Sequence, residues 1–212
     1  GRPIWGLYRV NNLSVTLQNP YNPSESLNFT GSITFGRDLF GSSYATTSDT
    51  TQWQIWGNRA FSKTVVSTTS GIDLSGLGSR YTTTNTTTYN YGIREVNNHD
   101  AYVNTSYTVE SLTAASDAFD NENVSGSKTS YVFGTSTNNM SDAEKNNAHG
   151  EVWHITEVIE QQTTISMDRN ADGDNNPNTD PNVDGDNDPA TDPGVVTLTG
   201  YGNLAIGTDS WG

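Results

Sequence analysis

The sequence predicts an all-β protein, an antiparallel β-sandwich or jelly roll, folded as a single domain over residues 1–212. Short stretches of alternating apolar and polar residues recur along the chain, and clusters of Gly, Pro, Asn and Ser separate them, as expected for strands joined by turns. Five Trp, ten Tyr and six Phe give the aromatic share of a folded β protein, although only 32% of the residues are hydrophobic. A chain of 212 residues is long enough to bury a core.

The first strands have the clearest pattern. Residues 12–18 alternate, with Leu13, Val15 and Leu17 on one face, and residues 27–35 repeat the pattern with one step broken by a glycine. Further short strands are expected at 53–56, 64–67, 91–96 and 102–112. Residues 82–88 are almost all Thr and offer little to bury, so we expect an exposed edge or a loop there.

Helix is expected to be scarce. Residues 111–119 could form two turns, and a capping box at Ser141 and Glu144 predicts a helix over residues 141–149. Residues 152–167 are rich in β-branched side chains and predict one long strand. Two short strands, at 195–198 and 204–206, complete a set of nine or ten.

The composition excludes several classes of function. A net charge of −14 argues against binding to nucleic acids or to anionic membrane surfaces. The absence of cysteine excludes disulfides, cysteine-ligated metals and thiol chemistry, and no apolar run is long enough to span a membrane. The chain begins with Gly1 and has no signal-like stretch, so we expect a processed or partial product that is extracellular or on the cell surface.

An acidic repeat occupies residues 168–194, and we expect it to be an insertion between strands of the domain. Two copies of D-x-N-x-D-G-D-N-[ND]-P-x-T start at Asp168 and Asp180, an offset of 12 residues. Oxygen ligands at alternate positions followed by glycine form a loop that can wrap one hard cation, and Ca²⁺ takes roughly six to eight such oxygens. Without counter-ions these carboxylates would repel each other, so a solvated acidic linker is the alternative.

The D-x-N-x-D-G core resembles the calcium loops of EF-hands, dockerins and thrombospondin type 3 repeats. Thr179 and Thr191 stand where an EF-hand has Glu, and Pro177 and Pro189 forbid a following helix. The tandem copies in residues 168–193 are therefore more similar to cysteine-free thrombospondin type 3 repeats. This resemblance implies a calcium-loaded spacer in an extracellular protein.

We expect two calcium sites, one per copy, that share ligands at their junction and bind Ca²⁺ cooperatively. The expected oxygen ligands are Asp168, Asn170, Asp172 and Asp174 for the first site, and Asp180, Asn182, Asp184, Asp186, Asp188 and Asp192 for the second.

Sequons permit N-glycosylation, and the Thr tract offers hydroxyls for O-glycans. The sequon asparagines are Asn12, Asn28, Asn85, Asn104, Asn123 and Asn139. We do not expect an enzyme, because no catalytic motif is present. Carboxylates could pair as in a glycosidase only if the fold sets two of them about 5–9 Å apart; the candidates are Glu151, Glu157 and Glu160. The histidines are expected on the surface: His99, His149 and His154.

These features favour a non-enzymatic structural protein, a calcium-stabilised subunit of a self-assembling surface filament, sheath or surface layer. Its expected partners are further copies of the chain and glycans, and the strand at 13–17 could add to a neighbouring sheet. A carbohydrate-binding or adhesin domain is the first alternative, since exposed aromatic rings stack on sugars, and a secreted glycosidase is the second. The rings considered for sugar binding are Trp5, Trp53, Trp56, Trp153, Trp211, Tyr81, Tyr89 and Tyr91, although one of Trp53 and Trp56 is expected in the core.

Overall fold

The computed structural model describes residues 10, 13–20, 22–74, 78–96, 99–117, 121–135, 153–167 and 196–208. These residues form twelve strands and no helix. The strands are β1 (Ser14–Asn19), β2 (Asn22–Thr30), β3 (Ser32–Arg37), β4 (Ser43–Trp56), β5 (Arg59–Asp73), β6 (Ser79–Val96), β7 (His99–Ser116), β8 (Glu122–Thr135), β9 (Trp153–Glu160), β10 (Thr163–Met167), β11 (Val196–Gly200) and β12 (Leu204–Thr208). Every pairing between the described strands is antiparallel, so the predicted fold class is confirmed.

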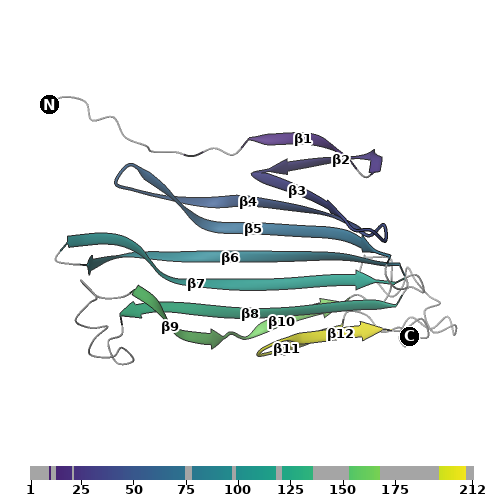
Figure 1. The fold of residues 1–212 in the computed structure, drawn as a ribbon. Coiled ribbons are helices and arrows are strands. Elements are labelled where there is room, and N and C mark those ends of the chain that lie inside the picture. The colour runs from purple at the N-terminus through teal and green to yellow at the C-terminus, as the bar shows by residue number, and fades with distance from the viewer. Residues whose placement is uncertain are drawn as a thin grey trace, which may run out of the picture.

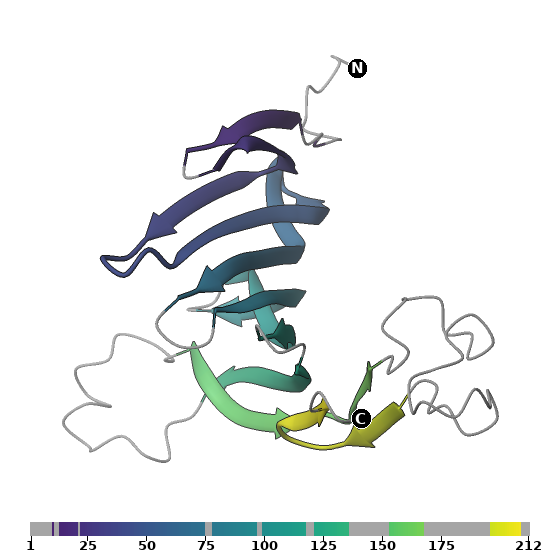
Figure 2. The same ribbon diagram turned by 90° about the vertical axis from the view of Figure 1, so that its right-hand side faces the viewer.

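Eight of the strands form one large sheet: seven follow the order β12-β8-β7-β6-β5-β4-β3, and the eighth, β9, pairs with β8. The outer edge of β8 is shared, because β12 pairs with residues 122–126 and β9 pairs with residues 129–135. The hairpin of β1 and β2 lies at one end of this stack of strands, and β9 to β12 lie at the other end (Figures 1 and 2).

The hairpin of β10 and β11 forms a second layer over the β8 and β12 end of the large sheet. The buried apolar side chains of the described residues are both on β10: Ile165, which is 2% exposed, and Met167. A Cβ built on Gly126 of β8 would lie 2.7 Å from Cγ2 of Ile165, so the glycine makes room for this side chain. The two sheets therefore pack face to face around Ile165.

The Thr tract lies in the middle of the large sheet, and the expectation of an exposed edge or a loop is wrong. Residues 82–88 belong to β6, which pairs with β5 on one side and with β7 on the other. Thr favours extended backbone because it is β-branched, and its hydroxyl can bond to a neighbour across the strands, so the tract needs no apolar burial. Thr83 and Thr113 are joined in this way at 2.9 Å, and Ser70 and Thr82 at 3.1 Å.

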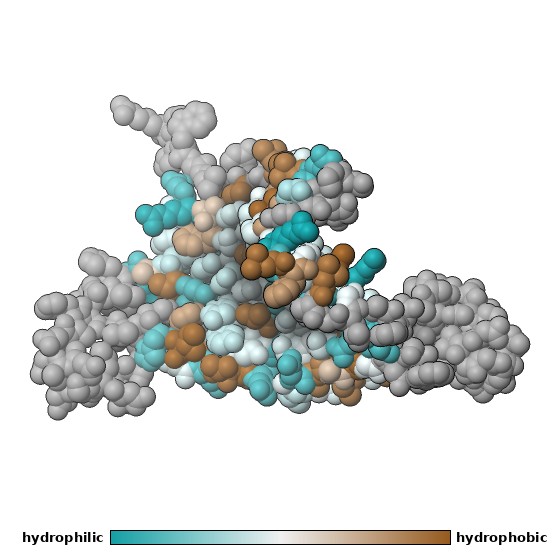
Figure 3. Space-filling view, turned by 45° about the vertical axis from the view of Figure 1, so that its right-hand side comes forward, coloured by the Kyte–Doolittle hydropathy of each residue, from teal (hydrophilic) through white to brown (hydrophobic). Residues whose placement is uncertain are grey.

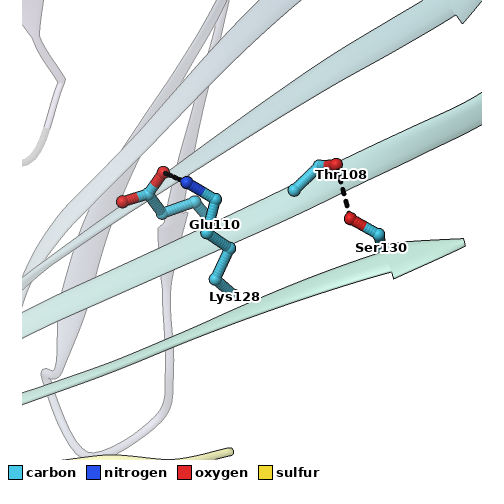
Figure 4. Close-up of polar contacts among 4 residues, drawn as sticks. All are labelled: Thr108, Glu110, Lys128 and Ser130. Atoms are coloured by element: carbon cyan, nitrogen blue, oxygen red, sulfur yellow. Dashed lines mark hydrogen bonds and ion pairs between the residues drawn. The ribbon is translucent and has the colours of Figure 1, made fainter. Parts of the chain in front are cut away.

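The same kind of pairing continues from β7 to β8. The hydroxyls of Thr108 and Ser130 lie 2.7 Å apart, and beside them Lys128 forms an ion pair with Glu110 at 3.3 Å (Figure 4). Polar side chains on this part of the sheet therefore satisfy one another across adjacent strands.

Three other predictions are corrected by the strand register. The short strands expected at 53–56 and 64–67 are parts of the longer β4 and β5, which are joined by Gly57 and Asn58 with φ of 53° and 62°. Two successive residues with positive φ make the tight turn that matches the twist of a hairpin. The helix considered at 111–119 is contradicted up to residue 116, because β7 is paired there on both sides.

The long strand expected over 152–167 is divided instead. Its first part is β9 in the large sheet, and its second part is β10 in the other layer. The helix predicted over 141–149 lies outside the described residues.

Replacement of Ile165 tests the contact between the two layers. Ile165→Ala should lower the free energy of unfolding by about 2–4 kcal/mol, because it leaves a cavity against Gly126, and Ile165→Val should cost about 1 kcal/mol. Urea unfolding measures both. Thr164→Ala, an exposed change on the same strand, is the control, and an equal loss of stability there would contradict the prediction.

Candidate functional site

All ten predicted calcium ligands lie between residues 168 and 192, outside the described residues. The strands on either side of that segment are described: β10 and β11 pair, with Met167 and Val196 as Cα partners. The residues that flank the predicted calcium segment therefore lie side by side on neighbouring strands. The donor set, Asp carboxylates with Asn side chains, matches the hard oxygen ligands that Ca²⁺ takes.

The described residues hold no group of three or more His, Asp or Glu side chains that could bind a metal. Glu157 pairs with Val132, and Glu160 pairs with Thr129. Because Glu157 and Glu160 are an odd number of residues apart on one strand, their carboxylates project from opposite faces of the sheet. They do not form the carboxylate pair of a glycosidase. His154 is half-buried on β9, while His149 and Glu151 lie outside the described residues, as does the side chain of His99.

The sequon asparagines differ in accessibility. Asn28 and Asn123 are exposed, and Asn28 accepts a hydrogen bond from the hydroxyl of Thr16 across the β1–β2 hairpin. Asn85 and Asn104 are half-buried in the large sheet. Asn12 and Asn139 lie outside the described residues. Exposure therefore favours Asn28 and Asn123 as acceptors of a glycan.

Eight aromatic residues form a continuous cluster, here called the aromatic ladder. It crosses strands β4 to β8 and consists of Trp56, Phe61, Tyr89, Tyr91, Tyr102, Tyr107, Tyr131 and Phe133. The rings of Trp56 and Tyr102 are stacked with centroids 4.9 Å apart, and those of Tyr107 and Tyr131 are stacked at 4.7 Å. The hydroxyl of Tyr91 donates to the carbonyl of Ser62 at 2.9 Å and fixes that ring in the middle of the ladder.

Stacking within the ladder uses ring faces. Interplanar angles of 10° for Trp56 and Tyr102, and of 15° for Tyr91 and Tyr102, show that Tyr102 stacks with two other rings. Such stacked pairs add about 0.5–1.5 kcal/mol each beyond the area they bury. The ladder therefore stabilises the sheet.

The sequence alone indicated Trp56, Tyr89 and Tyr91 as candidate sugar-binding rings but not the other ladder residues. Residues two apart on a strand, such as Tyr131 and Phe133, lie on the same face. This spacing was the feature of the sequence that could have indicated the ladder. The expectation that either Trp53 or Trp56 is a core residue is wrong, because they are 36% and 40% exposed. Trp5 and Trp211, and the side chain of Trp153, lie outside the described residues.

An exposed apolar stripe lies at the hairpin end of the molecule. Leu13 is 81% exposed, and Val15 and Leu17 follow at alternate positions on β1, also exposed. Val158 on β9, at the opposite end of the sheet, is 59% exposed. Figure 3 shows apolar residues near both ends and also across the middle of this face, interspersed with hydrophilic and neutral residues.

Burial in the aromatic ladder raises the pKa of three tyrosines: Tyr91, Tyr102 and Tyr107. Neighbouring tyrosines add to the rise in the pKa of Tyr91 and of Tyr107. Burial disfavours the charged phenolate, so the folded protein keeps protons that the unfolded chain loses.

The ladder should therefore make the protein sensitive to alkali. These tyrosines have a pKa of 10.0 in the unfolded chain and a higher pKa in the folded protein, so their contribution to stability should be present below pH 10.0 and be lost as the pH rises beyond it. Urea unfolding across this range, with tyrosinate absorbance, measures the effect. Tyr102→Phe should remove part of the pH dependence; a wild type whose stability stays constant to the highest pH would contradict the prediction.

No family model, curated protein or solved structure matches this chain. Within the described residues, no helix is long and apolar enough to cross a membrane. The function must therefore be argued from the acidic repeat, the exposed stripe and the single large sheet.

Proposed function

We propose that this chain is a non-enzymatic extracellular structural protein, a subunit that self-assembles into a surface filament, sheath or surface layer and is stabilised by calcium. The apolar stripe of Leu13, Val15 and Leu17 carries the proposal. It lies on a two-stranded sheet that is separate from the large one. A hairpin of two strands is only marginally stable alone, so the stripe needs a surface to cover it.

A second copy of the chain provides such a surface. Among the described strands, β3, β9 and β12 each pair along one edge only. Unpaired backbone groups at a sheet edge are a template for strands of another molecule. The stripe lies at one end and the exposed Val158 at the other, so a contact between unlike ends would repeat from copy to copy and build an open polymer.

Calcium would act at the acidic repeat. Its two ends are held together by the pairing of Met167 with Val196, next to the buried Ile165. Cation binding would order the segment between these anchors and offset the repulsion of its eight Asp residues. The acidic pI of about 4.3 and the absence of cysteine also fit an extracellular protein that gains stability from metal ions instead of disulfides.

Charge placed on the stripe tests assembly. Val15→Asp should abolish polymers, or raise the protein concentration they require at least about tenfold, because a buried carboxylate would have to be desolvated at the interface. Negative-stain electron microscopy and sedimentation with calcium present measure the result. Leu74→Asp is the control, an exposed leucine after β5, away from the sheet edges. A wild type that stays monomeric at high concentration would refute the assembly role.

Calorimetric titration with calcium tests the repeat. Two sites are expected in the wild type, and Asp172→Ala and Asp184→Ala should each remove one of them, because each takes away a central oxygen ligand. Asp100→Ala, an exposed carboxylate on β7, is the control and should bind like the wild type. Magnesium should substitute poorly, since it requires tight octahedral geometry.

The same experiment can contradict the calcium proposal. No calcium heat in the wild type, together with protease resistance of residues 168–194 that EDTA leaves unchanged, would make the repeat an acidic linker.

A further inference from the structure

We propose that Tyr44 and Tyr81 form a flat platform that binds a sugar chain of pyranose rings, a function beyond assembly. The two tyrosines belong to a register row in which glycine and tyrosine alternate over four neighbouring strands. Gly36 of β3 pairs with Tyr44 of β4, Tyr44 pairs with Gly71 of β5, and Gly71 pairs with Tyr81 of β6.

Both rings lie down on the sheet. A Cβ built on Gly36 would be 2.6 Å from the hydroxyl oxygen of Tyr44 and closer still to its ring atoms Cε1 and Cζ. A Cβ built on Gly71 would be 2.7 Å from the hydroxyl oxygen of Tyr81 and 2.8 Å from its Cζ. Each ring therefore occupies the space that a side chain on the neighbouring strand would fill. Tyr44 is 42% exposed, and Tyr81 is half-buried.

The spacing of the rings suits a chain ligand. Tyr44 and Tyr81 are two strands apart, so about 10 Å separates their backbones. Both rings lean toward the preceding strand, over Gly36 and Gly71, so the ring separation is similar. Two aromatic rings at this distance can each contact the apolar C–H face of alternate sugars in an extended chain.

Hydrogen-bonding groups lie beside the rings. A depression of about 430 Å³ is lined by both tyrosines together with Arg37, Asp38 and Asp73. The side chain of Asp38 accepts hydrogen bonds from two backbone amides of the β3–β4 turn, at 2.8 and 2.9 Å, which fixes the carboxylate at this rim. Carboxylates and a guanidinium are partners for sugar hydroxyls, and together with two ring faces they supply the mixed apolar and polar surface that a pyranose requires.

Binding can be measured with two defined probes, the β-1,4-linked hexasaccharides of glucose and of N-acetylglucosamine. Calorimetry and affinity electrophoresis should show that the wild type binds at least one of them. Tyr44→Ala and Tyr81→Ala should each weaken binding by about tenfold, because each removes one stacked ring. Tyr44→Phe keeps the ring and should bind within about twofold of the wild type.

Gly36→Ala tests whether binding needs the position of the Tyr44 ring, because this variant keeps the ring but moves it. Alanine can adopt the backbone of Gly36, where φ is not positive, but its Cβ would push the Tyr44 ring off the sheet. It should weaken binding about as much as Tyr44→Ala, although both tyrosines remain. Tyr201→Ala is the control; it removes an exposed ring on the turn after β11 and should leave binding unchanged.

Several results would overturn the proposal. They are a wild type that binds neither hexasaccharide at millimolar concentration, equal binding by the wild type and Gly36→Ala, or a loss of binding in Tyr201→Ala. Thermal unfolding of each variant identifies misfolding; if Tyr44→Ala does not fold, the comparison of Gly36→Ala with Tyr44→Phe decides. Calcium titration and electron microscopy of the same samples report on assembly, so the two proposals can fail separately.

Discussion

Cross-strand pairing of small hydroxyl side chains is the interaction on which the rest of this structure depends. One register row crosses Thr46, Thr69, Thr83 and Thr113 from β4 to β7, with hydroxyl contacts of 2.8 Å in the first pair and 2.9 Å in the last. Each such pair contributes only about 0.2–1 kcal/mol, but strands of 14 to 18 residues repeat it along their length. Many of the polar side chains are thus paired within the sheet, and the fully buried apolar side chains of the described residues are both on β10.

A sheet stabilised in this way gains more stability from strands added at its edges than from a second layer packed on its face. Lateral addition extends the backbone ladder and the hydroxyl rows, whereas a layer over Thr and Ser would bury polar groups for little apolar contact. Exposed apolar side chains occur at both ends of the stack, at Val15 on β1 and Val158 on β9, and also between them, as at Ile93 on β6. In the proposed assembly the two ends would meet, and calcium binding between Met167 and Val196 would help to hold β10 against β8.

Local alternation was enough to predict the fold class and the first strands, but the single strand predicted over residues 27–35 is divided at Gly31, whose φ of 81° separates β2 from β3. The Thr tract and residues 111–116 were misjudged because their strand identity comes from hydrogen bonds to partners on two other strands, not from burial. The ladder was missed for a related reason: Tyr107 and Tyr131 meet only once the β7–β8 register is known. The predicted calcium ligands rest on sequence spacing alone, because those residues lie outside the described ones.

The tyrosines on one face of β6 show how register decides what a ring can do. Tyr81 and Tyr89 are an even number of residues apart on the same strand and share a face. Tyr89 pairs with Tyr107, so its ring meets another ring and becomes part of the ladder. Tyr81 pairs with Gly71, which has no side chain, and the end of its ring lies over that glycine. The residue opposite each tyrosine thus determines whether its ring stabilises the fold or can bind a ligand.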